Sequence, residues 1–124
     1  MSRQADILAY FLKRKEIEWA QKELENNQNA DTTQGRFAIW LGIAPTTYSD
    51  LRNGRRLPSY ENLDLMAAKL GPQAYEAAGL PPRLPNDRRL RFIAAHWHKL
   101  TAEEQEELYK TAENKFSEEA LVTA

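Results

Sequence analysis

Residues 45–53 carry polar side chains whose spacing would place several hydrogen-bonding groups on one side of a helix. On a helix with about 100° per residue, burying Tyr48 and Leu51 turns four polar side chains toward solvent: Thr46, Ser49, Asp50 and Asn53. The major groove of DNA admits such a helix and presents a different pattern of donors and acceptors for each base pair. The hydroxyl groups can donate or accept, whereas an ionised aspartate only accepts, so Asp50 would favour a cytosine amino group and repel phosphate.

The residues around this helix carry the charge needed to bind phosphate. Between Thr33 and Tyr60 four arginines oppose a single aspartate, which gives a local charge of +3, although the whole chain carries −1. Charges further apart than about 8–10 Å are largely screened at physiological salt, so the local charge decides whether DNA can bind. Residues 83–91 also carry +3, while residues 101–124 carry −5. This distribution allows DNA binding and predicts a modest non-specific affinity.

Two short helices joined by a tight turn, within residues 33–54, would position these groups. Thr33 can act as the N-cap of the first helix, because its hydroxyl can accept a hydrogen bond from an amide of the first turn. Gly42 can adopt the left-handed conformation that ends this helix. Pro45 suits the first turn of the second helix, where an N–H group would have no partner. The buried stripe of the first helix would consist of three residues: Phe37, Ala38 and Leu41. The pattern predicts a helix-turn-helix.

The same segment resembles the Cro/repressor-type (lambda-repressor-like, XRE-family) helix-turn-helix DNA-binding proteins. The resemblance is carried by Thr33-Gln34, Ala38, Leu41-Gly42-Ile43, Thr46-Thr47 with Ser49, Gly54, and Pro58-Ser59. Residues 32–59 match the family pattern without a gap, and a looser match extends from about Ile17 to Pro82. Three positions depart from the family pattern. Ala44 stands where the family often has a serine N-cap, and Pro45 where it often has a long polar base-reading residue. Arg52 stands where it often has glutamate.

The resemblance implies a five-helix DNA-binding domain and gives roles to individual residues. The residues it places at the bases are Pro45, Thr46, Ser49 and Asp50. The residues it places at phosphates are Gln34, Thr47, Asn53, Arg55 and Arg56. Pro45 has no side-chain donor or acceptor, so it can make only apolar contact with a base. The alternatives are a solvated loop for the two arginines and a helix C-cap for Asn53.

The chain before the motif is expected to form one long helix, or two with a bend, over residues 5–26, a stretch rich in helix formers that contains neither Gly nor Pro. Ile17, Ala20 and Leu24 form the seam expected to pack on the motif. Residues 7–12 are apolar nearly all round, which is more than one face of a small domain needs. Either the C-terminal helices cover this segment or it meets a second subunit.

Two further helices are expected directly after the motif. Ser59 can cap a helix that runs to Leu70, where Gly71-Pro72 stops it. A short helix over residues 73–78 follows. Together these elements would complete a DNA-binding domain over residues 1–82.

The remaining residues, 83–124, predict a C-terminal helical hairpin. Residues 83–86 are expected to form a linker, after which Asn86 would cap a helix. Thr101 and Glu104 have the spacing of a capping box and would open a second, acidic helix. The predicted protein is therefore all-α, with a hairpin extension that offers an oligomerisation or partner surface.

Several classes of function are not supported by the composition. The chain has no cysteine, so disulfides and thiol chemistry are excluded, and no apolar run is long enough to span a bilayer. A cytoplasmic protein is expected. His96 and His98 would point to different sides of a helix, so no metal site is predicted, and no cofactor motif or catalytic triad is present. We therefore do not expect an enzyme.

The function favoured by the sequence is that of a sequence-specific transcriptional regulator, acting as a repressor or a phage-type switch. A homodimer on double-stranded DNA would place two recognition helices one DNA turn apart, about 34 Å. Two alternatives remain open. The protein could be the antitoxin of a toxin–antitoxin pair, binding DNA through the motif and a toxin through the C-terminal hairpin. It could also use the helix-turn-helix only as a protein-interaction scaffold, without binding DNA.

Overall fold

Only helices are found in the part of the chain that the computed structural model describes, residues 3–82 and 87–123, with side chains up to residue 117. The elements in chain order are α1 (Arg3–Asn26), α2 (Gln34–Leu41), α3 (Pro45–Arg52), α4 (Tyr60–Leu70), α5 (Gln73–Ala77), α6 (Arg88–His96), the 3₁₀ helix η1 (Trp97–Lys99) and α7 (Ala102–Thr123). The expected all-α class is confirmed for these residues.

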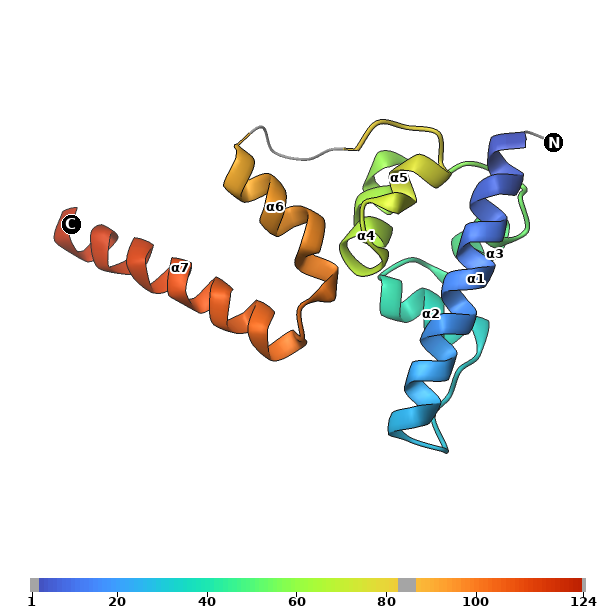
Figure 1. Ribbon diagram of the computed structural model, residues 1–124, viewed down its shortest axis with the longest axis horizontal. Coiled ribbons are helices and arrows are strands. Elements are labelled where there is room, and N and C mark those ends of the chain that lie inside the picture. Colours follow the sequence, from blue (N-terminus) through green and yellow to red (C-terminus); the bar gives the residue numbers. More distant parts are fainter. Residues whose placement is uncertain (1–2, 83–86, 124) are drawn as a thin grey trace.

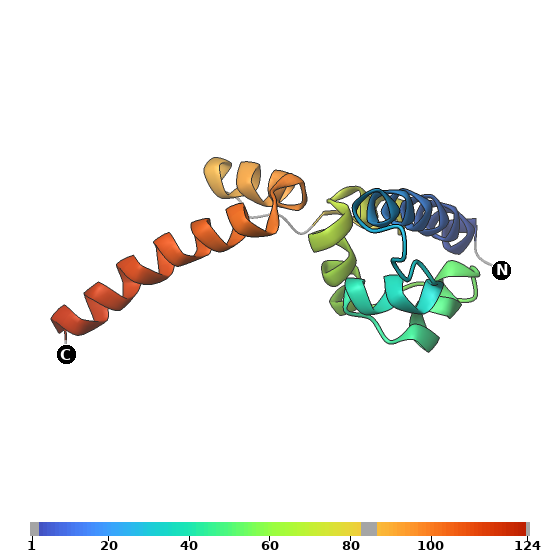
Figure 2. The same cartoon turned by 90° about the horizontal axis from the view of Figure 1, so that it is seen from below.

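Helices α1 to α5 pack together, and α6 and α7 extend to one side of them (Figures 1 and 2). These two helices meet at η1 and diverge from it; they correspond to the predicted hairpin and are called the hairpin below. The long helix α1 lies against α3 and α5 and also touches α2, while α2 packs on both α3 and α4. The 3₁₀ helix at the bend of the hairpin contacts α4. The first turn of α1 and the last turn of α7 lie at opposite ends of the molecule (Figure 1).

The core lies between α1 and the four short helices that follow it. Phe37 is the central aromatic residue, because its ring lies 5.2 Å from that of Trp19 and 5.4 Å from that of Tyr48. Burying several large apolar side chains in one cluster supplies the main driving force for folding a chain of this size. The largest fully buried side chains are Leu8, Leu12, Phe37, Leu41, Tyr48, Leu51, Leu63 and Met66.

The apolar residues near the N-terminus are buried within this core. Leu8, Phe11 and Leu12 are buried in the same cluster as the motif residues, whereas Ile7 and Tyr10 are exposed. The first alternative for this segment, that the C-terminal helices cover it, is wrong, because α1 packs on α3 and α5 instead. Two of its apolar residues remain on the surface, but the buried ones need no second subunit to cover them.

The expected packing seam of α1 is also wrong. Ile17 is 58% exposed and Leu24 is 43% exposed. The face that meets the motif runs instead through Leu12, Glu16 and Trp19, at spacings of four and three residues. Glu16, in the middle of this seam, is charged. A search for regularly spaced apolar residues therefore selects the neighbouring face of the helix, with Ile17 and Leu24, instead.

The predicted ends of the motif helices are confirmed. The hydroxyl of Thr33 accepts a hydrogen bond from the amide of Arg36 at 3.4 Å, and Ser59 caps α4 in the same way. Gly42 is left-handed, with φ of 87°, and its N–H donates to the carbonyl of Ile39. These local hydrogen bonds satisfy backbone groups that a helix end leaves without partners.

The C-terminal hairpin differs from the prediction at its first cap. Asp87, not Asn86, caps α6, since its carboxylate accepts from the amides of Arg89 and Leu90. The hydrogen bonds from Arg89 lower the pKa of Asp87. Asn86 and the rest of the predicted linker, residues 83–86, lie outside the described residues.

The predicted capping box at the start of α7 is confirmed. The amide of Glu104 donates to the Thr101 hydroxyl at 3.1 Å. In return, the amide of Thr101 donates to the Glu104 carboxylate at 2.9 Å. Two amides of the helix start are thus satisfied by the reciprocal pair.

The corrected seam of α1 gives a direct test of the packing. Leu12→Ala should reduce the free energy of unfolding by about 3 kcal/mol, because it leaves a cavity in a fully buried site. Ile17→Ala, on the exposed side of the same helix, should change it by less than about 0.5 kcal/mol. Urea unfolding of the two variants measures this difference, and equal losses of stability would contradict the packing described above.

Candidate nucleic-acid interface

The rotation of α3 is set by the two apolar side chains that it buries. Tyr48 and Leu51 are fully buried, as the sequence predicts. Pro45 lies in the first turn, also as predicted. The residues expected to read bases then occupy the outer side of the helix: Pro45 and Thr46 are exposed, and Ser49 and Asp50 are partly buried. These four residues are therefore brought together on one short element.

The residues expected to contact phosphate lie around this helix. Asn53, Arg55 and Arg56 are exposed at and after the C-terminal end of α3. Gln34 is the first residue of α2, and both it and Thr47 are partly buried. Arg56 has no ion-pair partner among the described residues, so its charge is available to an anion in solution.

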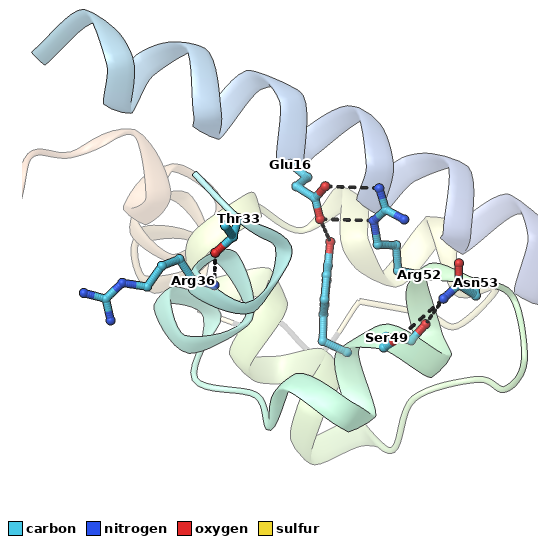
Figure 3. A network of polar contacts seen from close by, with 7 residues as sticks. Glu16, Thr33, Arg36, Ser49, Arg52 and Asn53 are labelled. Carbon is cyan, nitrogen blue, oxygen red and sulfur yellow. Dashed lines mark hydrogen bonds and ion pairs between the residues drawn. The ribbon is translucent and has the colours of Figure 1, made fainter. Parts of the chain in front are cut away.

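Asn53 serves as the C-cap of α3. Its side-chain amide donates to the backbone carbonyl of Ser49 at 2.8 Å and lies 3.3 Å from the Ser49 hydroxyl oxygen (Figure 3). The structure therefore confirms the alternative interpretation of Asn53 as a helix C-cap. The same contact orients the Ser49 hydroxyl, and the carbonyl oxygen of the Asn53 side chain has no part in it.

Asp50 and Arg55 form an ion pair on the outer side of α3. The Arg55 guanidinium lies 3.2 Å from the Asp50 carboxylate, and the two side chains are 63% and 40% exposed, respectively. An exposed pair of this kind contributes little to stability. Its consequence is electrostatic, because it neutralises one of the positive charges expected at the DNA backbone and occupies an acceptor expected at the bases.

A second polar contact joins α3 to α1. The Arg52 guanidinium donates to both carboxylate oxygens of Glu16, at 3.1 and 3.2 Å (Figure 3). The buried Tyr48 hydroxyl donates to the same carboxylate at 2.9 Å. Burial and the adjacent Glu16 carboxylate raise the pKa of Tyr48, so its hydroxyl stays protonated and keeps donating.

Sequence reasoning misses the role of Glu16 and marks Arg52 only as a departure from the glutamate frequent in the family. Two signals point to the pair: Arg52 follows the buried Tyr48 by one helical turn, and Glu16 follows the buried Leu12 by one turn. Each therefore lies beside an apolar stripe, where a charge needs a partner.

Other candidate sites are not assembled. The Nδ1 of His96 lies 2.8 Å from the carbonyl oxygen of Phe92, and His98 belongs to the next element, η1. Among the described residues no group of three potential metal ligands lies together. Within the same residues, no helix has both the length and the apolar character needed to cross a membrane.

The contact between Glu16, Tyr48 and Arg52 can be tested by a double-mutant cycle. Glu16→Ala should lower the free energy of unfolding by about 2 kcal/mol, because it leaves a buried hydroxyl and a partly buried guanidinium without their acceptor. Arg52→Ala should cost less, since Glu16 keeps the Tyr48 hydrogen bond. Urea unfolding of the single and double variants should give a coupling energy of about 1 kcal/mol. Strictly additive losses would show that the pair contributes nothing beyond side-chain packing.

Comparison of the sequence with protein-family models, with curated proteins and with solved structures gives no match.

Proposed function

We propose that this protein is a sequence-specific DNA-binding regulator of transcription, of the Cro/repressor type, that reads the major groove with α3. The observation that carries the proposal is the orientation of α3. Its apolar side is held in the core by Tyr48 and Leu51, while Thr46 and Asp50 lie on the outer side with hydrogen-bonding groups. A helix presented in this way can enter the major groove.

The charge around α3 supports the same proposal. Arg55 and Arg56 are exposed directly after the helix, where phosphate contacts would fix its position on the duplex. Contacts to phosphate supply most of the non-specific affinity of a DNA-binding protein. The Asp50–Arg55 pair must open, at least in part, if both side chains are to meet DNA. The proposed protein therefore exchanges an internal ion pair for contacts to DNA.

The hairpin supports a homodimer as the DNA-binding form. Among the residues whose side chains the structure describes, α6 exposes three large apolar side chains and α7 exposes three more. Contact between two hairpins would cover these side chains and could bring a basic α6 against an acidic α7. A homodimer of this kind would act in the cytoplasm, on a roughly palindromic DNA site. The exposed apolar residues are Leu90, Phe92 and Ile93 in α6, and Leu108, Tyr109 and Phe116 in α7.

The same exposed apolar surface favours a second candidate, the antitoxin of a toxin–antitoxin pair, in which a toxin covers the hairpin. The Asp50–Arg55 pair and the net charge of −1 favour a third, a protein-interaction scaffold that does not bind DNA. Binding to DNA separates the scaffold from the other two candidates. The oligomeric state of the isolated chain separates the homodimer from a protein that needs a different partner.

Base-reading and phosphate-binding residues should respond differently to substitution. Thr46→Ala should weaken binding to a duplex enriched from a random library by about 1–3 kcal/mol and leave scrambled DNA unaffected. Arg56→Ala should weaken binding to both duplexes alike and reduce the slope of log K against log salt by about one. Fluorescence anisotropy over a salt series measures both. Equal effects of the two substitutions on both duplexes would contradict the assignment, and the absence of salt-dependent DNA binding would favour the scaffold.

Releasing Arg55 from its ion pair should strengthen binding to DNA of any sequence. Asp50→Asn removes the carboxylate, so the affinity for scrambled DNA should rise by about tenfold at low salt and the salt slope should steepen by about one. Discrimination at the base pair read by Asp50 should fall at the same time. The double variant Asp50→Asn, Arg55→Ala is the control and should lose the gain in affinity. An unchanged salt slope in the single variant would show that Arg55 does not reach phosphate.

A further inference from the structure

A cavity of about 510 Å³ lies where the hairpin meets the first helices. Its lining residues come from α1, α2, α4, η1 and the two residues after η1, and none comes from α3. The volume falls within the range of sites that hold small molecules, about 300–1,000 Å³. The cavity is therefore separate from the proposed DNA-reading helix and large enough for a small organic ligand.

Two tryptophans form an apolar wall of this cavity. The rings of Trp19 and Trp40 lie 6.1 Å apart, and Trp40 stacks on Phe37 at 5.7 Å, so the core supports both rings. Leu70 and Leu100 add aliphatic surface. A flat aromatic group would gain both apolar burial and ring contacts against such a wall.

The charged side chains around the cavity favour an anion. Lys15 is paired with Glu18 at 3.2 Å. The ammonium of Lys69 lies 5.2 Å from the centre of the Trp40 ring, so a positive charge is held directly beside the aromatic wall. In total, four lysines and two glutamates line the cavity: Lys15, Lys22, Lys69, Lys99, Glu18 and Glu23.

Two buried nitrogens beside the cavity lack a hydrogen-bond partner among the described residues. They are Nε1 of Trp19 and Nδ1 of His98, and both residues line the cavity. Burial and, to a smaller extent, the positive charge of the neighbouring Lys99 lower the pKa of His98, so the ring is neutral near pH 7. Both atoms are inaccessible to solvent, so the first contacts of a ligand in the cavity would be with the tryptophan rings and the lysines.

We propose that this cavity binds a small aromatic carboxylate. The aromatic body would lie against Trp19 and Trp40, and the carboxylate would face the lysines. This site goes beyond the proposed DNA binding and does not depend on it. Because η1 belongs to the hairpin and α1, α2 and α4 belong to the first part of the chain, a bound ligand would contact both.

The test uses 2-naphthoate as the probe and its neutral analogue 2-naphthamide as the control ligand, with the full-length protein. The indole N–H signals in a ¹H–¹⁵N spectrum report on the site. The naphthoate should shift the signals of Trp19 and Trp40 saturably, while the signal of Trp97, which lines a different hollow, should move little. The amide should bind at least about tenfold more weakly, since it lacks the charge that the lysines attract.

Matched lysine variants locate the charge selectivity. Lys22→Gln and Lys69→Gln change exposed side chains at the cavity, so the fold should persist, and each should weaken naphthoate binding by about three- to fivefold. Lys13→Gln changes an exposed lysine of α1 that does not line the cavity and should leave binding unchanged. The far-ultraviolet circular dichroism of all three should match the wild type.

Three results would overturn the proposal. One is the absence of saturable shifts of Trp19 and Trp40 at millimolar naphthoate. Another is equal affinity for the acid and the amide, which would remove the role of the lysines. The third is an equal effect of Lys13→Gln and the two cavity variants, which would indicate only a general attraction of the anion to the protein. None of these measurements involves DNA, so failure of the DNA-binding proposal would remain a separate result.

Discussion

The position of α3 depends on one carboxylate. Glu16 accepts hydrogen bonds from the Tyr48 hydroxyl and the Arg52 guanidinium, and both donors belong to α3. Apolar packing of Tyr48 and Leu51 is non-directional and would allow the helix to slide or turn slightly. Hydrogen bonds to a fixed carboxylate are directional, so within the orientation set by apolar packing they restrict the rotation of α3 and its position along α1. Contacts on the buried side of α3 therefore determine which of its residues form the proposed DNA-reading surface.

The outer side of α3 is held less firmly than the inner side. The Asp50–Arg55 pair is exposed and Asn53 closes only its own helix, so these contacts can rearrange when a partner approaches. This contrast suits a helix that must keep its orientation while its outer side chains adapt to DNA. In the proposed complex, the internal ion pair also penalises DNA that offers no suitable donor to Asp50, because separating the pair then brings no compensating contact.

The hairpin has the opposite character from the first five helices. Its large apolar side chains are mostly exposed, and its contact with the rest of the chain runs through η1 and α4. The cavity lies at this contact, which is where a ligand could change how the hairpin is held. The proposed homodimer and the proposed ligand site would then share one structural element, while α3 remains outside both.

Elements whose contacts are local could be predicted from the sequence, whereas contacts between distant helices could not. The caps at Thr33, Gly42 and Ser59 follow from residue type, because each bonds to residues within four or five positions along the chain. The burial of Tyr48 and Leu51 follows from helical spacing. The roles of the residues expected to contact DNA, from residue 34 to residue 56, stay predictions with which the fold is compatible.

The face of α1 that packs on the motif, and the charges that pair across the fold, follow from tertiary packing alone. Glu16 and Arg52 are far apart in the sequence, and neither is apolar, so no periodic pattern connects them. The cavity likewise joins Trp19 to His98, from opposite parts of the chain. Contacts of this kind depend on how whole helices are placed against each other. That placement results from packing the entire core, and no short stretch of sequence contains it.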